Sequence, residues 1–236
     1  MLIILKALAD FFYPPVCANC DGLTEESGTL CANCRGQLVF TRSYTAEYAG
    51  LLYLDEILIL ARYRRGLQTI LQKIKFSGQK NLLPLLTDEF KLLWDETGQA
   101  ELDCLLQNYK GKTLAVIPVP TDLARLRERG YDLPEQIFKN WSEHQGYQWQ
   151  TCLERKLNKP PQYGLSGLER KNNMLGVMTA QYLPPEDILL IVDDILTTGA
   201  TLAECARALR TAGGENKTII GLALAGDTQT PEKIKF

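Results

Sequence analysis

Histidine is almost absent from this chain: His144 is the single one in 236 residues. This scarcity leaves little room for multi-histidine metal sites or for a triad built on histidine. Long apolar runs are also missing, because none approaches the about 20 residues that a membrane-spanning helix needs. The net charge is only −2, so the composition carries no basic footprint of a dedicated duplex-binding domain. What remains, 45% apolar and 23% charged residues, is typical of a soluble globular protein.

The length predicts one large domain with a small appendage, since domains usually hold about 100–200 residues. The apolar start, Met1 to Tyr13, lacks the basic beginning and small-residue cleavage site of a signal peptide. We interpret it as a short helix that packs on the body of the protein or on a partner. A cytoplasmic protein with reduced thiols and no membrane span is therefore expected.

Apolar runs of strand length predict a parallel sheet that is buried on both faces. A helical pattern joins two of these runs, and buried strand, helix, buried strand is typical of a parallel α/β fold. Other segments indicate a strand leading into a basic helix, a second helix followed by a looser acidic stretch, and a long exposed loop. The runs are 114–119, 188–192 and 218–225, the joining helix is 201–212, and the other segments are 57–76, 82–95 with 96–106, and 155–173.

Four of the seven cysteines form two Cys-x2-Cys pairs that are separated by ten residues. Two-residue spacing lets both thiolates of a pair face one ion at tetrahedral geometry. We interpret the set as a structural zinc site, which four protein ligands close and which is not expected to catalyse. Two disulfides or a redox pair are the alternative, and an oxidising compartment would favour them. The ligands are Cys17, Cys20, Cys31 and Cys34, whereas Cys104, Cys152 and Cys205 are predicted to be small buried side chains.

Two adjacent carboxylates, Asp193 and Asp194, follow one of the apolar runs and precede a Thr-Thr-Gly-Ala-Thr segment that opens onto a helix. Open α/β sheets bind ligands at the carboxyl ends of their strands, and N–H groups at a helix start favour a phosphate. Gly199 permits close approach of the backbone to that phosphate. Paired carboxylates suit a phosphate ligand only if it also carries vicinal hydroxyls and a divalent cation. The segment therefore predicts a sugar phosphate site, and an Asp-rich turn that caps a helix is the alternative.

This motif resembles the signature of type I phosphoribosyltransferases, which bind phosphoribosyl pyrophosphate with magnesium. The resemblance implies that Asp193 and Asp194 are the catalytic acids and hold the ribose hydroxyls directly or through Mg²⁺. It also implies that 197–201 cradles the 5′-phosphate. The expected phosphoribosyl pyrophosphate site is Asp193, Asp194, Ile195, Leu196, Thr197, Thr198, Gly199, Ala200 and Thr201, with Val119, Pro120 and Thr121 as the pyrophosphate loop.

Basic residues are concentrated in three segments despite the small net charge. Residues 57–87 carry six basic side chains and no acid, residues 155–183 carry five against one glutamate, and a third cluster follows the turn at 118–120. Clusters in loops around a ligand edge favour anion binding, although a solvated face is the alternative for any one residue. The candidate contacts to pyrophosphate or DNA are Arg62, Arg64, Lys75, Arg127, Arg129, Arg155 and Arg170.

Over nearly its full length the chain resembles the ComF family, including its GntX-like members, which pair a four-cysteine zinc motif with a phosphoribosyltransferase-type domain. Weaker patterns support the resemblance by their order and spacing. They are Lys75-Phe76-x-Gly78, Arg127-x-Arg129-Gly130-Tyr131, and Pro161-Gln162 followed by Leu165, Arg170 and Asn173. Asp132 and Leu133 stand where the family usually has an Asn-Gln pair, and Lys159 stands where it usually has threonine.

The resemblance implies a fold and two candidate functions. The fold is an α/β domain at residues 41–236, a parallel sheet flanked by helices, after an N-terminal helix and zinc motif at residues 1–40. The first function is natural transformation: the chain handles incoming single-stranded DNA with DNA-uptake or processing proteins and binds phosphoribosyl pyrophosphate and Mg²⁺. The alternative is an active transferase in which a nitrogen nucleophile displaces pyrophosphate. Aromatic side chains among the basic residues, for which core packing is the other interpretation, are candidates for base stacking: Tyr63, Phe76, Tyr131 and Tyr163.

Overall fold

The computed structural model describes residues 10–24, 29–47, 51–156 and 176–226. Within them a six-stranded sheet has the order β1-β2-β8-β7-β3-β4. β1 is antiparallel to β2, and every other neighbouring pair is parallel. The strands are β1 (Val39–Thr45), β2 (Glu56–Arg62), β3 (Leu114–Pro118), β4 (Gln148–Trp149), β7 (Ile188–Leu196) and β8 (Thr218–Gly226); β5 (Leu153–Arg155) and β6 (Met178–Ala180) form a separate antiparallel pair.

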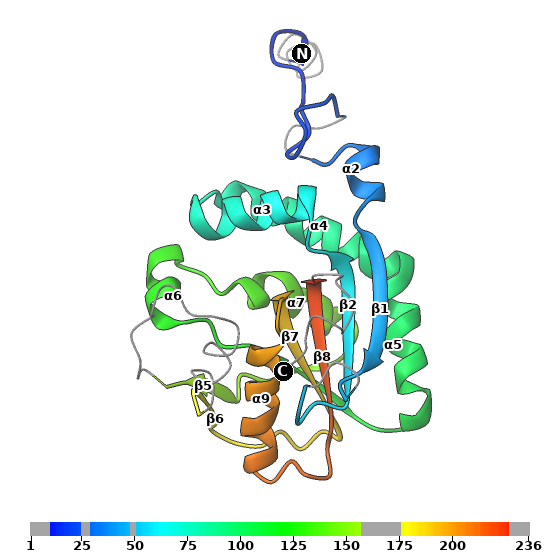
Figure 1. The fold of residues 1–236 in the computed structure, drawn as a ribbon, viewed down its shortest axis with the longest axis vertical. Helices are drawn as coiled ribbons and strands as arrows, with labels where there is room; N and C mark the ends of the chain where they lie inside the picture. Colours follow the sequence, from blue (N-terminus) through cyan, green and yellow to red (C-terminus); the bar gives the residue numbers. More distant parts are fainter. Residues whose placement is uncertain (1–9, 25–28, 48–50, 157–175, 227–236) are drawn as a thin grey trace.

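Helices cover both faces of this sheet, and Figure 1 shows α9 on the face opposite α7. The parallel strands read as continuous apolar runs because both of their faces are covered. A π-helical turn, Trp94–Gly98, joins α4 to α5, and short 3₁₀ turns lie at Lys80–Leu82 and Gln107–Tyr109. The α-helices are α2 (Ala32–Gly36), α3 (Arg65–Phe76), α4 (Leu83–Leu93), α5 (Gln99–Leu106), α6 (Leu123–Arg129), α7 (Leu133–His144) and α9 (Ala200–Thr211).

The core consists of two apolar layers, one on each face of the sheet. In β7, Leu190 and Val192 contribute to the layer beneath α3, α4 and α7, whereas Leu189 and Ile191 contribute to the layer beneath α9. This alternation is what a strand with a two-residue side-chain period produces when both faces are buried. The cysteine segment adds Leu30 to the first layer, so it packs on the same core as the sheet.

The predicted fold class is confirmed: the sheet is mostly parallel and flanked by helices, and the four cysteines of the N-terminal segment come together. Two predicted boundaries are wrong. The strand expected to end before the acidic pair continues to Leu196, because its pairing with β8 extends to Gly226. The stretch expected to be loose before Leu106 is helical as α5. Most of the expected N-terminal helix and of the expected long loop lies outside the described residues.

Among the helices that the structure describes, none is long and apolar enough to cross a membrane.

Candidate functional site

The acidic pair lies at the carboxyl end of β7, and its second member forms an ion pair. The Nζ atom of Lys75 lies 2.5 Å from Oδ2 of Asp194, and the two side chains are only 16% and 9% exposed. Lys75 belongs to the last turn of α3, which therefore brings a cation to the end of the strand. Charge balance at Asp194 thus comes from a residue that lies 119 positions earlier in the chain.

The first member, Asp193, is held by its neighbour's backbone. Its Oδ1 atom accepts a hydrogen bond of 2.8 Å from the main-chain N–H of Asp194. Burial raises the pKa of the Asp193 carboxyl well above its ordinary value, the charge of Asp194 raises it further, and Lys75 lowers it. Two carboxylates this close do not ionise independently, so an added cation or a hydroxyl donor would relieve a real electrostatic cost.

The segment after β7 turns sharply at Gly199, which immediately precedes α9. Gly199 has φ of 71°, in the left-handed region that favours glycine, and a Cβ placed on it would lie 2.3 Å from Cδ1 of Leu51. Among the described residues, the main-chain N–H groups of Gly199 and Thr201 have no hydrogen-bond partner. Unpaired N–H groups at a helix start, together with the helix dipole, form a site for an anion.

The expected pyrophosphate loop lies beside this turn, after β3. Its amide donors are already used: Val119 donates to the carbonyl of Val192 at 3.0 Å, and Thr121 donates to Oδ2 of Asp132 at 3.3 Å. Pro120 has no N–H group. The main-chain N–H groups of this loop are therefore already paired, and a main-chain contact to a ligand at Thr121 would require Asp132 to release it.

The four cysteines form a second site, at the side of the molecule where Figure 1 shows α2. Their Sγ atoms all lie within 4.8 Å of one another, and those of Cys20 and Cys31 are 3.7 Å apart. A tetrahedral zinc ion with zinc–sulfur bonds of about 2.3 Å requires sulfur–sulfur separations of about 3.8 Å. The number, chemistry and spacing of these donors therefore fit zinc.

Hydrogen bonds to sulfur support the same interpretation. The main-chain N–H of Cys31 donates to Sγ of Cys17 at 3.4 Å, and Nδ2 of Asn19 donates to Sγ of Cys34 at 3.3 Å. Burial raises the pKa of Cys17, but N–H donors from Cys31 and Asn19 outweigh it and lower that pKa to about 6. Asn19 lowers the pKa of Cys34, but burial and the other thiols raise it to about 12. Neighbouring thiolates repel one another, and a bound cation would offset that repulsion.

This zinc knuckle, residues 16–36, is joined to the helices beside it. Asn19 Oδ1 accepts a hydrogen bond from Thr69 at 3.1 Å, and the carbonyl of Ala18 accepts one from Lys73 at 3.2 Å. Arg35 in α2 forms a 2.6 Å ion pair with Glu89 in α4, whose side chain is 1% exposed. α3 therefore forms hydrogen bonds with the zinc knuckle through Thr69 and Lys73 and an ion pair with Asp194 through Lys75.

Comparison with known proteins matches the N-terminal cysteine segment to a family model and most of the chain to several relatives. Residues 8–47 match the model of a double zinc ribbon domain. The chain is 28% identical to competence protein F of Haemophilus influenzae over 219 residues, which cover 89% of this chain and 85% of that protein. It is 26% identical to the DNA utilization protein YhgH of Escherichia coli K12, over 82% of this chain and 83% of that one. It is 25% identical to competence protein ComFC of Streptococcus pneumoniae, over 85% and 84%.

These similarities, over more than four fifths of the chain, support the ComF family. The zinc ribbon match and the four-thiol cluster together support a structural role for zinc in this chain.

The structure separates the predicted basic residues into groups. Lys75 contacts Asp194, and Arg129 is held beside it by a 3.2 Å hydrogen bond from Nε to the carbonyl of Lys75. Burial raises the pKa of the Cys205 thiol, and the charge of Arg155 in β5 opposes that shift. The others lie elsewhere: the guanidinium of Arg62 covers the Phe40 ring at 4.7 Å, Arg64 and Arg127 are exposed, and Arg170 is outside the described residues.

The aromatic candidates also differ from one another. Phe76, which follows Lys75 at the end of α3, is 74% exposed and is free to stack. Tyr131 is half-buried and donates from its hydroxyl to the carbonyl of Ile74 at 3.3 Å, which favours the packing interpretation. Tyr63 is half-buried near Asp194, and burial together with that charge raises its pKa. Tyr163 lies outside the described residues.

Several residues of the site carry no signal that sequence reasoning used. Leu51 packs against Gly199 from the loop before β2, and Asp132 ties the pyrophosphate loop to the start of α7. The sequence shows that Asp132 stands where the family usually has asparagine, but it gives no sign that Asp132 contacts Thr121. Of the three unassigned thiols, Cys152 and Cys205 are buried as predicted, whereas the prediction for Cys104 is wrong because it lies on the exposed side of α5.

Proposed function

We propose that this chain acts in natural transformation, in the handling of incoming DNA, and that its α/β domain binds phosphoribosyl pyrophosphate with Mg²⁺. The names of its relatives, two competence proteins and a DNA utilization protein, support the first part. The second part rests on one observation. The acidic pair, Lys75 and the unpaired N–H groups of the turn before α9 all lie at the carboxyl end of the sheet.

Each group has a distinct task at this site. The N–H groups of Gly199 and Thr201 would bind the 5′-phosphate, because the helix dipole and unpaired donors favour an anion there. Asp193 and Asp194 would accept hydrogen bonds from the two ribose hydroxyls. Lys75 and Arg129 would face the pyrophosphate, whose negative charge they reduce.

The carboxylates also fit a magnesium ion, which prefers oxygen ligands and retains several waters. Asp193 and Asp194 would hold it, directly or through water, and the ion would supply positive charge to the pyrophosphate. Lys75 already neutralises part of the negative charge of Asp194. This neutralisation reduces the electrostatic repulsion between the acidic pair and an anionic ligand.

Titration calorimetry tests the pocket. Wild type is expected to bind phosphoribosyl pyrophosphate in the presence of Mg²⁺, and Asp193→Asn/Asp194→Asn is expected to lose at least tenfold in affinity. Asp103→Asn, an exposed carboxylate on α5, is the matched control and is expected to bind as wild type does. Absence of binding to wild type, or equal loss in the control, would reject the pocket.

A separate experiment tests contact with DNA. Reversing charge with Arg62→Glu/Arg64→Glu is expected to weaken retention of single-stranded DNA and to reduce its salt dependence, because phosphate contacts release counterions. Lys91→Glu on α4 reverses an exposed charge on a different helix and is the control. Retention that neither salt nor the double reversal changes would contradict a role for these two arginines.

An active transferase is the second candidate, favoured by the cation Lys75 beside the acidic pair and by Arg129, which donates to the carbonyl of Lys75. In that reaction the bond between the anomeric carbon and pyrophosphate breaks, a carbon–nitrogen bond forms, and the nucleophile loses one proton. Positioning and charge stabilisation would supply most of the catalysis. Incubation with nucleobases and Mg²⁺ separates the two: pyrophosphate release that Asp193→Asn/Asp194→Asn abolishes indicates a transferase, and binding without release indicates a ligand-binding domain.

A further inference from the structure

The N-terminal arm, residues 10–15, leaves most of its apolar surface in solvent. Phe11, Phe12 and Tyr13 are 79%, 71% and 83% exposed, although they follow one another in the chain. Single exposed apolar side chains are normal on a protein surface, but a group of them marks an interaction site. The apolar start of the chain was expected to pack on the body or on a partner, and these three rings do not pack on the body.

The zinc knuckle holds the end of this arm and adds apolar surface beside it. Val16, its first residue, forms a β-bridge with Leu23, which is itself 73% exposed. The main-chain N–H of Thr24 also donates to the carbonyl of Pro15 at 3.0 Å. These contacts fix the point where the arm leaves the knuckle, and Figure 1 shows the arm projecting beyond α2, away from the sheet. Five of the eleven exposed large apolar side chains in the described part of the chain therefore fall within residues 11–23.

The charge of the arm restricts what can cover these rings. Asp10 is its single charged residue, and the arm contains no lysine or arginine. Nucleic acids and anionic lipid surfaces are bound mainly through lysine and arginine, so the arm suits neither of them. An apolar protein surface is the partner that its chemistry favours, because burying aromatic rings against such a surface leaves no charge unpaired.

We propose that the arms of two copies of this chain pack against each other and join the copies as a dimer. Each arm would cover the rings of the other, in the symmetric arrangement in which one surface meets its own copy. Aromatic side chains bury about 150–250 Å² each, so the six largely exposed rings of two arms would bury about 700–1,200 Å². Stable specific interfaces begin at about 1,000–1,200 Å². The dimer is therefore reversible, and its population depends on concentration.

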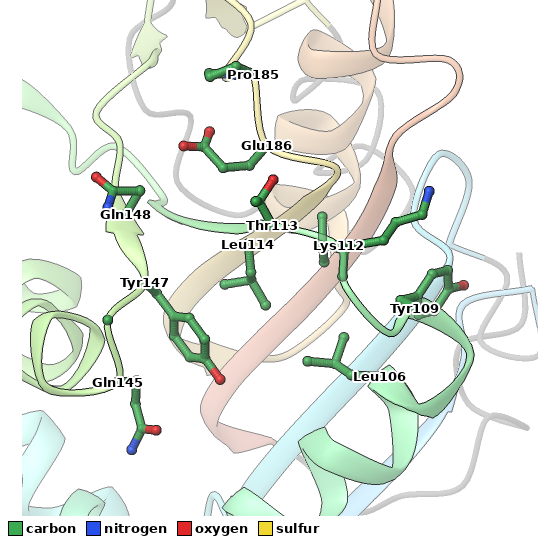
Figure 2. A pocket seen from close by; sticks show the side chains of 12 residues that line it. Leu106, Tyr109, Lys112, Thr113, Leu114, Gln145, Tyr147, Gln148, Pro185 and Glu186 are labelled. Atoms are coloured by element: carbon green, nitrogen blue, oxygen red, sulfur yellow. The ribbon is translucent and has the colours of Figure 1, made fainter.

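A cavity of ≈ 590 Å³ beside the first residues of β3 and β7 is a second surface that the arm of another copy could enter. Figure 2 shows the polar side chains of Lys112, Gln145 and Gln148 around its aliphatic ones. Aromatic rings placed there would remove these polar groups from water without giving them partners, which costs free energy. An arm in a cavity also joins two different surfaces, so such a contact continues beyond two chains unless a ring closes. Contact between two arms is favoured, and it ends at the dimer.

Sedimentation velocity over a wide range of concentration tests the dimer. The zinc-loaded wild-type chain is expected to change from monomer to dimer as its concentration rises and to form nothing larger. Phe11→Glu/Phe12→Glu, which brings four carboxylates together at the contact, is expected to stay monomeric. Leu52→Glu/Phe76→Glu alters two exposed apolar side chains of the body and is the matched control, expected to associate as wild type does. A wild-type monomer at every concentration, growth beyond two chains, or equal association of the arm variant would overturn the proposal.

Hydrogen exchange locates the contact in the unaltered chain, so it holds even if the arm variant does not fold. The amides of Phe12, Tyr13 and Leu23 are expected to exchange several-fold more slowly at concentrations where the dimer forms, whereas that of Tyr53, an exposed residue before β2, should not change. Slower exchange confined to other segments would show that the copies associate elsewhere. Slower exchange of the arm in the monomer on vesicles of anionic phospholipid would assign the arm to a lipid surface. Either result would overturn the proposal.

Discussion

At Gly199 the backbone and the packing impose the same requirement. Its positive φ excludes most side chains on conformational grounds, and Leu51 fills the space that a Cβ would occupy. The same residue begins the helix whose N–H groups remain unpaired. The shape of the proposed phosphate site therefore depends on the loop before β2 as well as on its own segment.

Gly199→Ala is expected to lower the free energy of unfolding by about 2–4 kcal/mol, the sum of a left-handed alanine and a local overpacking. Gly111→Ala is the matched control, since Gly111 has φ of 78° and open space around it, and should lose only about 1 kcal/mol. Urea denaturation measures both. Leu51→Ala should reduce the effect of Gly199→Ala in a double-mutant cycle, and equal losses for the two glycines would argue against the clash.

The raised pKa of Asp193 makes stability depend on pH in a definite direction. Below the ordinary carboxyl pKa of about 3.9 the group is protonated in both states. As pH rises, the unfolded chain ionises first, so the folded state loses relative stability until its own pKa is passed. Asp193→Asn removes this loss, and its stability gain over wild type should therefore grow from pH 4 towards neutral pH. A gain that is constant with pH in urea titrations would contradict the shift.

At the scale of elements, the short helix α2 is fixed to α4 by one ion pair. Glu89 accepts from both Nε and Nη2 of Arg35, although its own side chain is buried in the apolar layer. Desolvating a carboxylate is costly unless its partner is present, so this contact specifies where the zinc knuckle lies more than it adds net stability.

Arg35→Met is accordingly expected to lower the free energy of unfolding by about 2–4 kcal/mol, because it removes the partner of a buried charge. Lys139→Met, which breaks the exposed pair with Glu135, should cost about 0.5 kcal/mol or less. Chemical denaturation compares them. Arg35→Met/Glu89→Leu should recover most of the loss, and a double variant as unstable as the single one would show that the charge was not the cause.

For the whole molecule, the sequence predicted what is local and missed what is distant. Strands β2, β3, β7 and β8, the two Cys-x2-Cys pairs and the acidic pair with Gly199 are each contained within a few residues, so the sequence alone indicates them. Strands β1, β4, β5 and β6 were not predicted. The partner of Asp194 is not: Lys75 meets it only after the sheet has formed. The end of β7 was misjudged for the same reason, because pairing with β8, not hydrophobicity, determines where it stops.

Zinc should stabilise the whole chain and not the knuckle alone, since Leu30 and Cys34 belong to the same apolar layer as the sheet. Wild type is expected to release one zinc ion per chain to a colorimetric chelator on unfolding, and Cys31→Ser to contain little zinc and to melt several degrees lower. Cys104→Ser, an exposed thiol outside the cluster, should keep both zinc and melting temperature. Full zinc content in Cys31→Ser would contradict the four-thiol assignment.

The contacts of α3 have a consequence for its length. Lys73 faces the zinc knuckle and Lys75 faces Asp194, and two residues along a helix correspond to about 200° of rotation. The helix is thus held from opposite sides. An insertion of one residue between the two lysines would turn one side by about 100° relative to the other. α3 should therefore tolerate many substitutions but no change in residue count between these positions, and related chains should keep this spacing wherever both contacts are kept.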